Sequence, residues 1–129
     1  MTRKEFEKLI EEGFLAVPEK FRKRMKNVAF LAEDEPPWSV REQEGLTDDE
    51  TLFGLYAGVP VSARGDFYGV GPTMPDTITI YQKPIEEEAK GDSARIRKFV
   101  HDTVWHEVAH YLGLDEEEVR KREEERGIK

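Results

Sequence analysis

The sequence of 129 residues lacks cysteine altogether, and it has no apolar run long enough to cross a membrane. Without cysteine the chain can form neither a disulfide scaffold nor a cysteine-based metal or redox site, which is typical of a reducing compartment. The first ten residues are rich in charged side chains and lack an apolar run, so they do not resemble a secretion signal. We therefore expect a cytoplasmic protein that does not associate with a membrane.

Amide side chains are also scarce, because Asn27, Gln43 and Gln82 are the only ones, whereas charged residues make up 37% of the chain. Few amides and many charges are typical of thermophilic proteins, which indicates a thermophilic source. The formal net charge is −8 at pH 7. Since a surface of this sign repels phosphates, we do not expect nucleic acid or anionic membranes as partners.

Length and patterning predict one α+β domain over residues 1–129. Three stretches have the apolar or alternating pattern of strands, at residues 28–32, 51–61 and 76–81. A long acidic loop is expected at residues 33–50. The expected helices run from a capping box at Thr2 to about Gly13, from Pro18, over residues 84–90, from Asp92 or Ser93 to Gly113, and over residues 115–126.

The longest of these helices carries the most informative motif of the chain, His106-Glu107-x-x-His110. Two histidines four residues apart lie about 40° apart around a helix and one turn apart along it, so both imidazoles can reach one metal ion. Glu107 lies at about 60° to 100° from them, which suits it less to ligation than to accepting a proton from a water on that ion. We therefore predict a Zn²⁺ site with His106 and His110 as ligands and Glu107 as the general base.

Apolar residues cover the other faces of this helix and indicate that its end is buried. They are Val104, Trp105, Val108, Ala109, Tyr111 and Leu112. A buried carboxylate and two buried imidazoles cost on the order of several kcal/mol unless they are paired or bind a metal, and the segment holds no Lys or Arg. The alternative is a histidine pair on a solvated helix face. His101, about 140° around the helix from His106, is interpreted as a surface histidine and not as a ligand.

A catalytic zinc site normally has a third protein ligand and a water. Gly113 permits a sharp change of direction after the helix, and in the long zinc-peptidase pattern the chain then returns a third ligand to the metal. Glu116 has that position here, with Asp115 as its closest competitor and Glu117 less suited. An acidic first helical turn, which complements the helix dipole, explains the same residues without a metal.

Three stretches, which together span roughly residues 17–119, carry a resemblance to a known family. They are His106-Glu107-x-x-His110-x-x-Gly113-x-x-Glu116, Gly54-Leu55-Tyr56-x-Gly58-Val59-Pro60 with Arg64 after it, and Pro75-Asp76-x-Ile78-Thr79-Ile80-Tyr81 followed by Pro84-Ile85. In these stretches the chain resembles the minimal zincins, small bacterial proteins described as predicted zinc-dependent proteases. The resemblance implies a minimal zincin-like core, in which a short three- to four-stranded mixed sheet packs on the active-site helix with additional helices. Family members often have Asp where this chain has Glu116.

The activity expected from this site is hydrolysis of a peptide bond in a peptide or protein substrate. Zinc lowers the pKa of a bound water toward about 7, and Glu107 takes the proton and later passes it to the leaving amine. If the strand at residues 76–81 forms the edge of the sheet, it is expected to hold the substrate; a half-buried strand without this role fits equally well. For oxyanion stabilisation the sequence does not choose among Tyr56, Tyr68, Tyr81, Tyr111 and Arg64.

Two other classes of function stay open. One is a zinc-binding interaction module with little or no turnover, which the lack of a second subdomain to close the cleft favours. The other is a metal-free acidic interaction protein in which the motif is coincidental. The sequence does not indicate an oligomeric state.

Overall fold

The computed structural model describes residues 1–47, 51–58 and 75–125, without the side chains of Glu116, Arg122, Glu123 and Glu125. The predicted α+β class is confirmed. The helices are α1 (Arg3–Leu15), α2 (Glu19–Arg22), α3 (Trp38–Gln43), α4 (Gln82–Glu88), α5 (Ser93–Leu112) and α6 (Glu116–Glu125), and the strands are β1 (Val28–Glu33), β2 (Gly54–Ala57) and β3 (Asp76–Tyr81). No described helix combines the length and the apolar character that a membrane span requires.

The strands form one mixed sheet in the order β1-β3-β2, with β1 parallel and β2 antiparallel to β3. This confirms the short mixed sheet that we expected. β3 has the predicted bounds, but it is the central strand, so the hypothesis that residues 76–81 form a sheet edge over the cleft is wrong. Ile78 and Ile80 of β3 are fully buried because both point to the face of the sheet that the helices cover. The strand beside α5 at the edge of the described sheet is β2.

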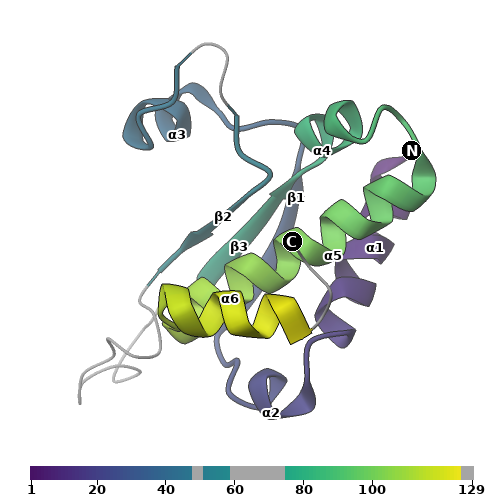
Figure 1. The fold of residues 1–129 in the computed structure, drawn as a ribbon. Helices are drawn as coiled ribbons and strands as arrows, with labels where there is room; N and C mark the ends of the chain where they lie inside the picture. The colour runs from purple at the N-terminus through teal and green to yellow at the C-terminus, as the bar shows by residue number, and fades with distance from the viewer. Residues whose placement is uncertain (48–50, 59–74, 126–129) are drawn as a thin grey trace.

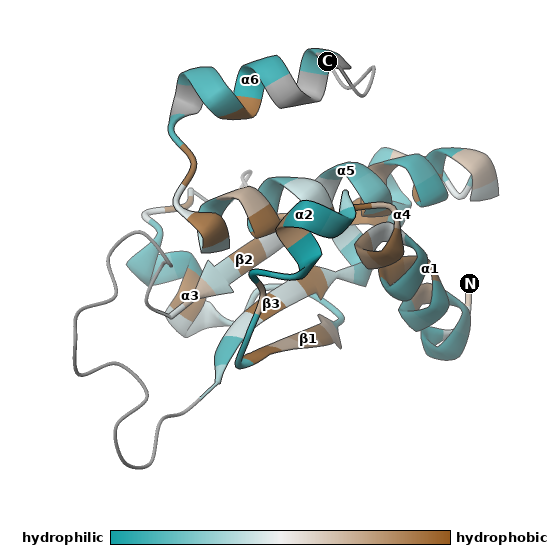
Figure 2. Cartoon of the chain, turned by 90° about the horizontal axis from the view of Figure 1, so that it is seen from below, coloured by the Kyte–Doolittle hydropathy of each residue, from teal (hydrophilic) through white to brown (hydrophobic). Residues whose placement is uncertain are grey.

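Helices α1 and α5 cover one face of this sheet (Figures 1 and 2). Ile78 pairs with Phe30 on one side and with Tyr56 on the other, so these three side chains point toward the helical layer. From α5, the fully buried Val100 and Val104 complete the same core. Packing against the sheet therefore fixes the position of α5.

The ends of the helices agree with the sequence in part. Thr2 and Glu5 form the predicted capping box, but α1 continues through Gly13 to Leu15. A Cβ at Gly13 would lie 3.3 Å from Cβ of Val104, so this glycine allows α1 to pack closely against α5 and does not end the helix. The predicted loop at residues 33–50 is also wrong in part, since α3 begins there after Pro37.

Helix α5 has the predicted ends. The side chain of Asp92 accepts a hydrogen bond from the N–H of Arg95 at its start, and Gly113 has a left-handed backbone with a φ of 74° at its end. The α6 helix, which follows this turn, runs back in roughly the opposite direction (Figures 1 and 2). The reversal that we expected at Gly113 is therefore confirmed.

Candidate metal centre and substrate cleft

A cleft of about 650 Å³ lies between β2 and one face of α5. The wall from α5 consists of side chains spaced three or four residues apart, which is the spacing of one helix face. They are Phe99, Asp102, Thr103, His106, Glu107 and His110, and the opposite wall is formed by residues 51–56 with Glu44. The predicted motif therefore opens into a cleft between β2 and α5, and not onto an isolated stretch of surface.

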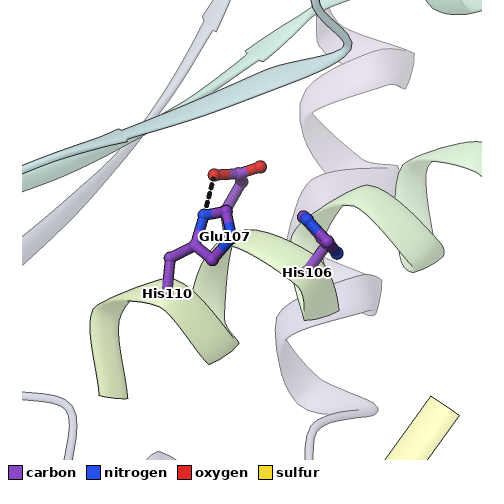
Figure 3. Close-up of side chains that lie close together, drawn as sticks. All are labelled: His106, Glu107 and His110. Carbon is purple, nitrogen blue, oxygen red and sulfur yellow. Dashed lines mark hydrogen bonds and ion pairs between the residues drawn. The ribbon is translucent and has the colours of Figure 1, made fainter. Parts of the chain in front are cut away.

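His106, Glu107 and His110 lie close together in this cleft (Figure 3). One nitrogen from each imidazole and one carboxylate oxygen lie within 4.8 Å of one another. The two rings lie edge to face, with centroids 4.6 Å apart and an interplanar angle of 67°. The helix thus brings together the three residues that the sequence singled out.

The two imidazoles are exposed, so the expectation that they are buried is wrong. The side chain of His110 is 48% exposed, whereas that of Glu107 is 8% exposed. The apolar residues around the motif bury the opposite faces of α5 in the core, and the histidines point into the open cleft. An accessible pair of imidazoles suits a site that must admit both an ion and a substrate.

The carboxylate of Glu107 has a fixed place beside β2. Its Oε1 accepts a hydrogen bond of 3.1 Å from the backbone N–H of Tyr56, and the same oxygen lies 3.2 Å from Nδ1 of His110 (Figure 3). β2 comes this close because Gly54 has no side chain: a Cβ there would lie 2.7 Å from Cγ2 of Thr103 and 3.2 Å from Cγ of Glu107. The sequence analysis missed this contact of β2 with Glu107, although a glycine at the start of a strand indicates close approach.

The side chain of Tyr56 packs against Tyr111 and Asp76. Its hydroxyl donates a 2.7 Å hydrogen bond to Oδ2 of the buried Asp76, and its ring meets that of Tyr111 edge to face at 5.9 Å. The backbone of Gly58 packs on the same carboxylate, since a Cβ there would lie 2.3 Å from Cγ of Asp76. These contacts hold β2 in a position from which the backbone N–H of Tyr56 reaches Glu107.

Two of the five candidates for oxyanion stabilisation use their hydroxyl groups in other hydrogen bonds. The hydroxyl of Tyr56 donates to Asp76, and the hydroxyl of the buried Tyr111 forms hydrogen bonds with the backbone of Lys26. Tyr81 is 2% exposed, and burial, followed by the charge of Glu33, raises its pKa. Arg64 and Tyr68 lie outside the described residues. The described tyrosines are therefore poor candidates for this role.

The acids after Gly113 differ in what the structure describes. Asp115 caps α6, because its Oδ1 accepts a 2.7 Å hydrogen bond from the N–H of Glu118. This accounts for Asp115 without a metal. Glu117 is exposed, and Glu116 is the first residue of α6, with its side chain outside the described part. Ligation by Glu116 stays a prediction.

His101 is half-buried against α1, so its interpretation as a surface histidine is wrong. Its Nε2 lies 3.5 Å from Oε2 of Glu12, and its side chain is 22% exposed. Burial, followed by the charge of Arg97, lowers its pKa. Among the described residues, the group of side chains that could hold a metal ion consists of His106, Glu107 and His110 and does not include His101.

The donors on this cleft wall fit a zinc ion. Imidazole nitrogens and carboxylate oxygens are its usual ligands besides thiolate, and the exposure of both imidazoles leaves room for an ion. Among known proteins, the family model described as "Zincin-like metallopeptidase" matches residues 25–126, from before β1 to the end of α6. No curated protein matches the chain.

Proposed function

Because the chain belongs to the zincin-like metallopeptidase family, we propose that it hydrolyses peptide bonds with a zinc ion and with Glu107 as the general base. The observation that carries this proposal is the group of donor atoms from His106, Glu107 and His110, within 4.8 Å of one another in the wall of a cleft. Peptides or proteins are the substrates.

His106 and His110 would hold the ion, with Glu116 as the third ligand. An ion held there acts as a Lewis acid that polarises the substrate carbonyl and makes water acidic. The turn at Gly113 supports the role of Glu116, because it places the start of α6 just after the end of the helix that bears both histidines. Asp115 is the weaker candidate, since it caps α6.

Glu107 would accept the proton of the attacking water and pass it to the leaving amine. Its Oε1 is held by the N–H of Tyr56, so we assign the proton transfer to Oε2. The hydrogen bond from the backbone keeps the carboxylate in one orientation, and a positioned base is more effective than a mobile one. The low exposure of Glu107 also keeps bulk water away from this carboxylate.

The substrate would lie along β2, which takes the role that the sequence analysis gave to residues 76–81. β2 borders the cleft, and β3 is the one strand of the described residues that pairs with it. The other edge of such a strand offers backbone donors and acceptors to an extended peptide, except the N–H of Tyr56, which donates to Glu107. A peptide that pairs there passes over the face of α5 that carries Glu107.

The experiment is to load the purified protein with zinc and incubate it with an unfolded polypeptide. We expect cleavage that a chelator abolishes and that added zinc restores. Glu107→Gln should slow cleavage by about 10²-fold or more, because the general base is lost while the shape is kept. Glu117→Gln is the matched control, since Glu117 is an exposed acid of the same size that follows the motif; it should keep full activity.

The other outcomes distinguish the alternatives. Zinc uptake without cleavage by the wild-type protein would replace the proposal with a zinc-binding interaction module. A protein that takes up no zinc at neutral pH would leave a metal-free acidic protein. Cleavage by Glu107→Gln at the wild-type rate would remove Glu107 from the mechanism.

A further inference from the structure

Two phenylalanines line the end of the cleft that lies away from His110. Phe53 precedes β2 and Phe99 belongs to α5, and both line the cleft together with the histidines. Their rings are tilted by 52° with centroids 5.8 Å apart, and both side chains are half-buried. Partly exposed aromatic surface inside a cleft is typical of a site that binds an apolar group.

The distance of this aromatic pair from the general base follows from the way β2 runs along α5. Both elements run in the same direction (Figure 1), and their contacts advance together, from Phe53 with Phe99 to Tyr56 with Glu107. Three strand residues span about 10 Å and eight helix residues about 12 Å. The pair therefore lies about three residues of extended peptide away from Glu107.

The charges of the cleft limit the kind of peptide that fits. Its charged side chains, apart from the histidines, are the acids Glu44, Asp102 and Glu107, and no Lys or Arg lines it within the described residues. Asp102 is paired with Lys98 at 2.8 Å, while Glu44 is exposed. An acidic peptide would be repelled there, whereas a neutral or basic one would not.

We propose that Phe53 and Phe99 form a subsite for a bulky apolar side chain of a peptide without acidic residues, about three residues from the bond that is cleaved. The position of the cleaved bond rests on the proposed function. Binding of the side chain does not, because it requires the cleft and not the hydrolysis. The two parts can therefore be tested separately.

Binding is measured with zinc-loaded Glu107→Gln protein, which leaves the peptide intact, and with short fluorescent peptides of Gly, Ser and Lys. One peptide carries a single Phe, and its reference carries Ala at the same place. We expect the Phe peptide to bind about tenfold tighter by fluorescence anisotropy, because burying a phenyl ring is favourable. Phe99→Ala, added to the same protein, should reduce the difference to about twofold or less.

Phe14→Ala is the matched control. Phe14 is also a half-buried helical phenylalanine, paired edge to face with Phe30 at 5.2 Å, but it does not line this cleft. Its loss should weaken packing to a similar degree and leave the preference for Phe unchanged. Equal loss of the preference in both variants, or its retention in Phe99→Ala, would overturn the subsite.

Cleavage of the same peptides by the zinc-loaded wild-type protein, mapped by mass spectrometry, tests the position. A cut about three residues from the Phe supports the proposal, and cuts that ignore the Phe overturn it while the peptidase function stands. If binding depends on Phe99 but no peptide is cleaved, the subsite stands and the proposed hydrolysis is wrong.

Discussion

Glu107 and the histidines beside it have opposite surroundings, although they are neighbours on one helix. The histidines are exposed in the cleft, while the side chain of Glu107 is 8% exposed and is held by the N–H of Tyr56. A metal ligand has to be reachable, whereas a general base has to be held in one orientation. The local environment therefore agrees with the role that we propose for each residue.

The motif itself could be predicted from sequence because it is local, since helix geometry alone fixes how residues 106, 107 and 110 lie. The contact of Tyr56 with Glu107 joins residues 51 positions apart, and the periodic pattern of a helix or a strand cannot predict a contact between two distant segments. The exposure of the histidines was misjudged for the same reason, because it depends on which side of α5 the rest of the chain covers.

At the residue scale, Gly54→Ala tests whether the close approach of β2 holds Glu107, the proposed general base, in place. A Cβ would lie 2.7 Å from Cγ2 of Thr103, so β2 must shift, at a cost of about 1–3 kcal/mol of unfolding free energy. We expect about a tenfold or greater loss of kcat for peptide cleavage, with zinc affinity within about twofold of wild type. Chemical denaturation, steady-state kinetics and zinc titration measure the three quantities.

The control for this variant is a compensating change. Thr103→Ser removes the methyl group that the new Cβ would meet, and it keeps the hydroxyl that donates to the backbone carbonyl of Phe99. The double variant should regain part of both the stability and the rate. If Gly54→Ala alone has wild-type kcat, the contact between β2 and Glu107 does not matter for activity.

At the scale of elements, the local patterns predicted β3 and α5 well. Strict alternation gave the bounds of β3, and a capping Asp92 with Gly113 gave the ends of α5. The order of the strands could not be predicted, because the pattern of one strand does not say which strands lie beside it. The short α3 was missed because an acidic, proline-containing stretch reads as a loop.

The packing of α1 against α5 predicts a pH dependence of stability. Burial lowers the pKa of His101 at this contact, although Glu12 on α1 and Asp102 on α5 act in the opposite direction. Below about pH 6.5, the usual pKa of a histidine, His101 therefore binds a proton more readily in the unfolded chain than in the folded chain. Protonation favours the unfolded state, so the free energy of unfolding should fall as the pH falls through this range.

His101→Gln should flatten this dependence, because an amide does not titrate. Urea denaturation of the metal-free proteins at pH 7 and at pH 5 measures the change in unfolding free energy for each. We expect the loss between the two pH values to be smaller in His101→Gln than in wild type. An equal loss in wild type and His101→Gln would contradict the account of the α1–α5 contact.

At the scale of the whole molecule, one sheet with helices α1 and α5 on one face is sufficient to present the site. The sheet supports α5, the edge strand β2 runs alongside α5, and α6 follows the turn at Gly113 (Figure 1). Sequence analysis predicted this set of parts from patterns and from a resemblance. Their arrangement around a cleft needed the structure, because contacts between distant segments decide it.

Zinc bound at this site should stabilise the whole fold, because the unfolded chain does not hold the ligands together. A ligand present at a hundredfold excess over its Kd adds roughly 2.7 kcal/mol to the free energy of unfolding. Zinc should therefore raise the melting temperature of the wild-type protein, and it should have little effect on a variant that lacks a ligand.

The central claim is that His106 and His110 hold one zinc ion, and calorimetric titration of the metal-free protein with zinc tests it most directly. We expect one ion per chain, at least about tenfold weaker binding in His106→Ala and in His110→Ala, and weaker binding in Glu116→Gln but not in Asp115→Asn. His106→Ala and His110→Ala proteins that both bind zinc with the stoichiometry and affinity of the wild type would contradict the account.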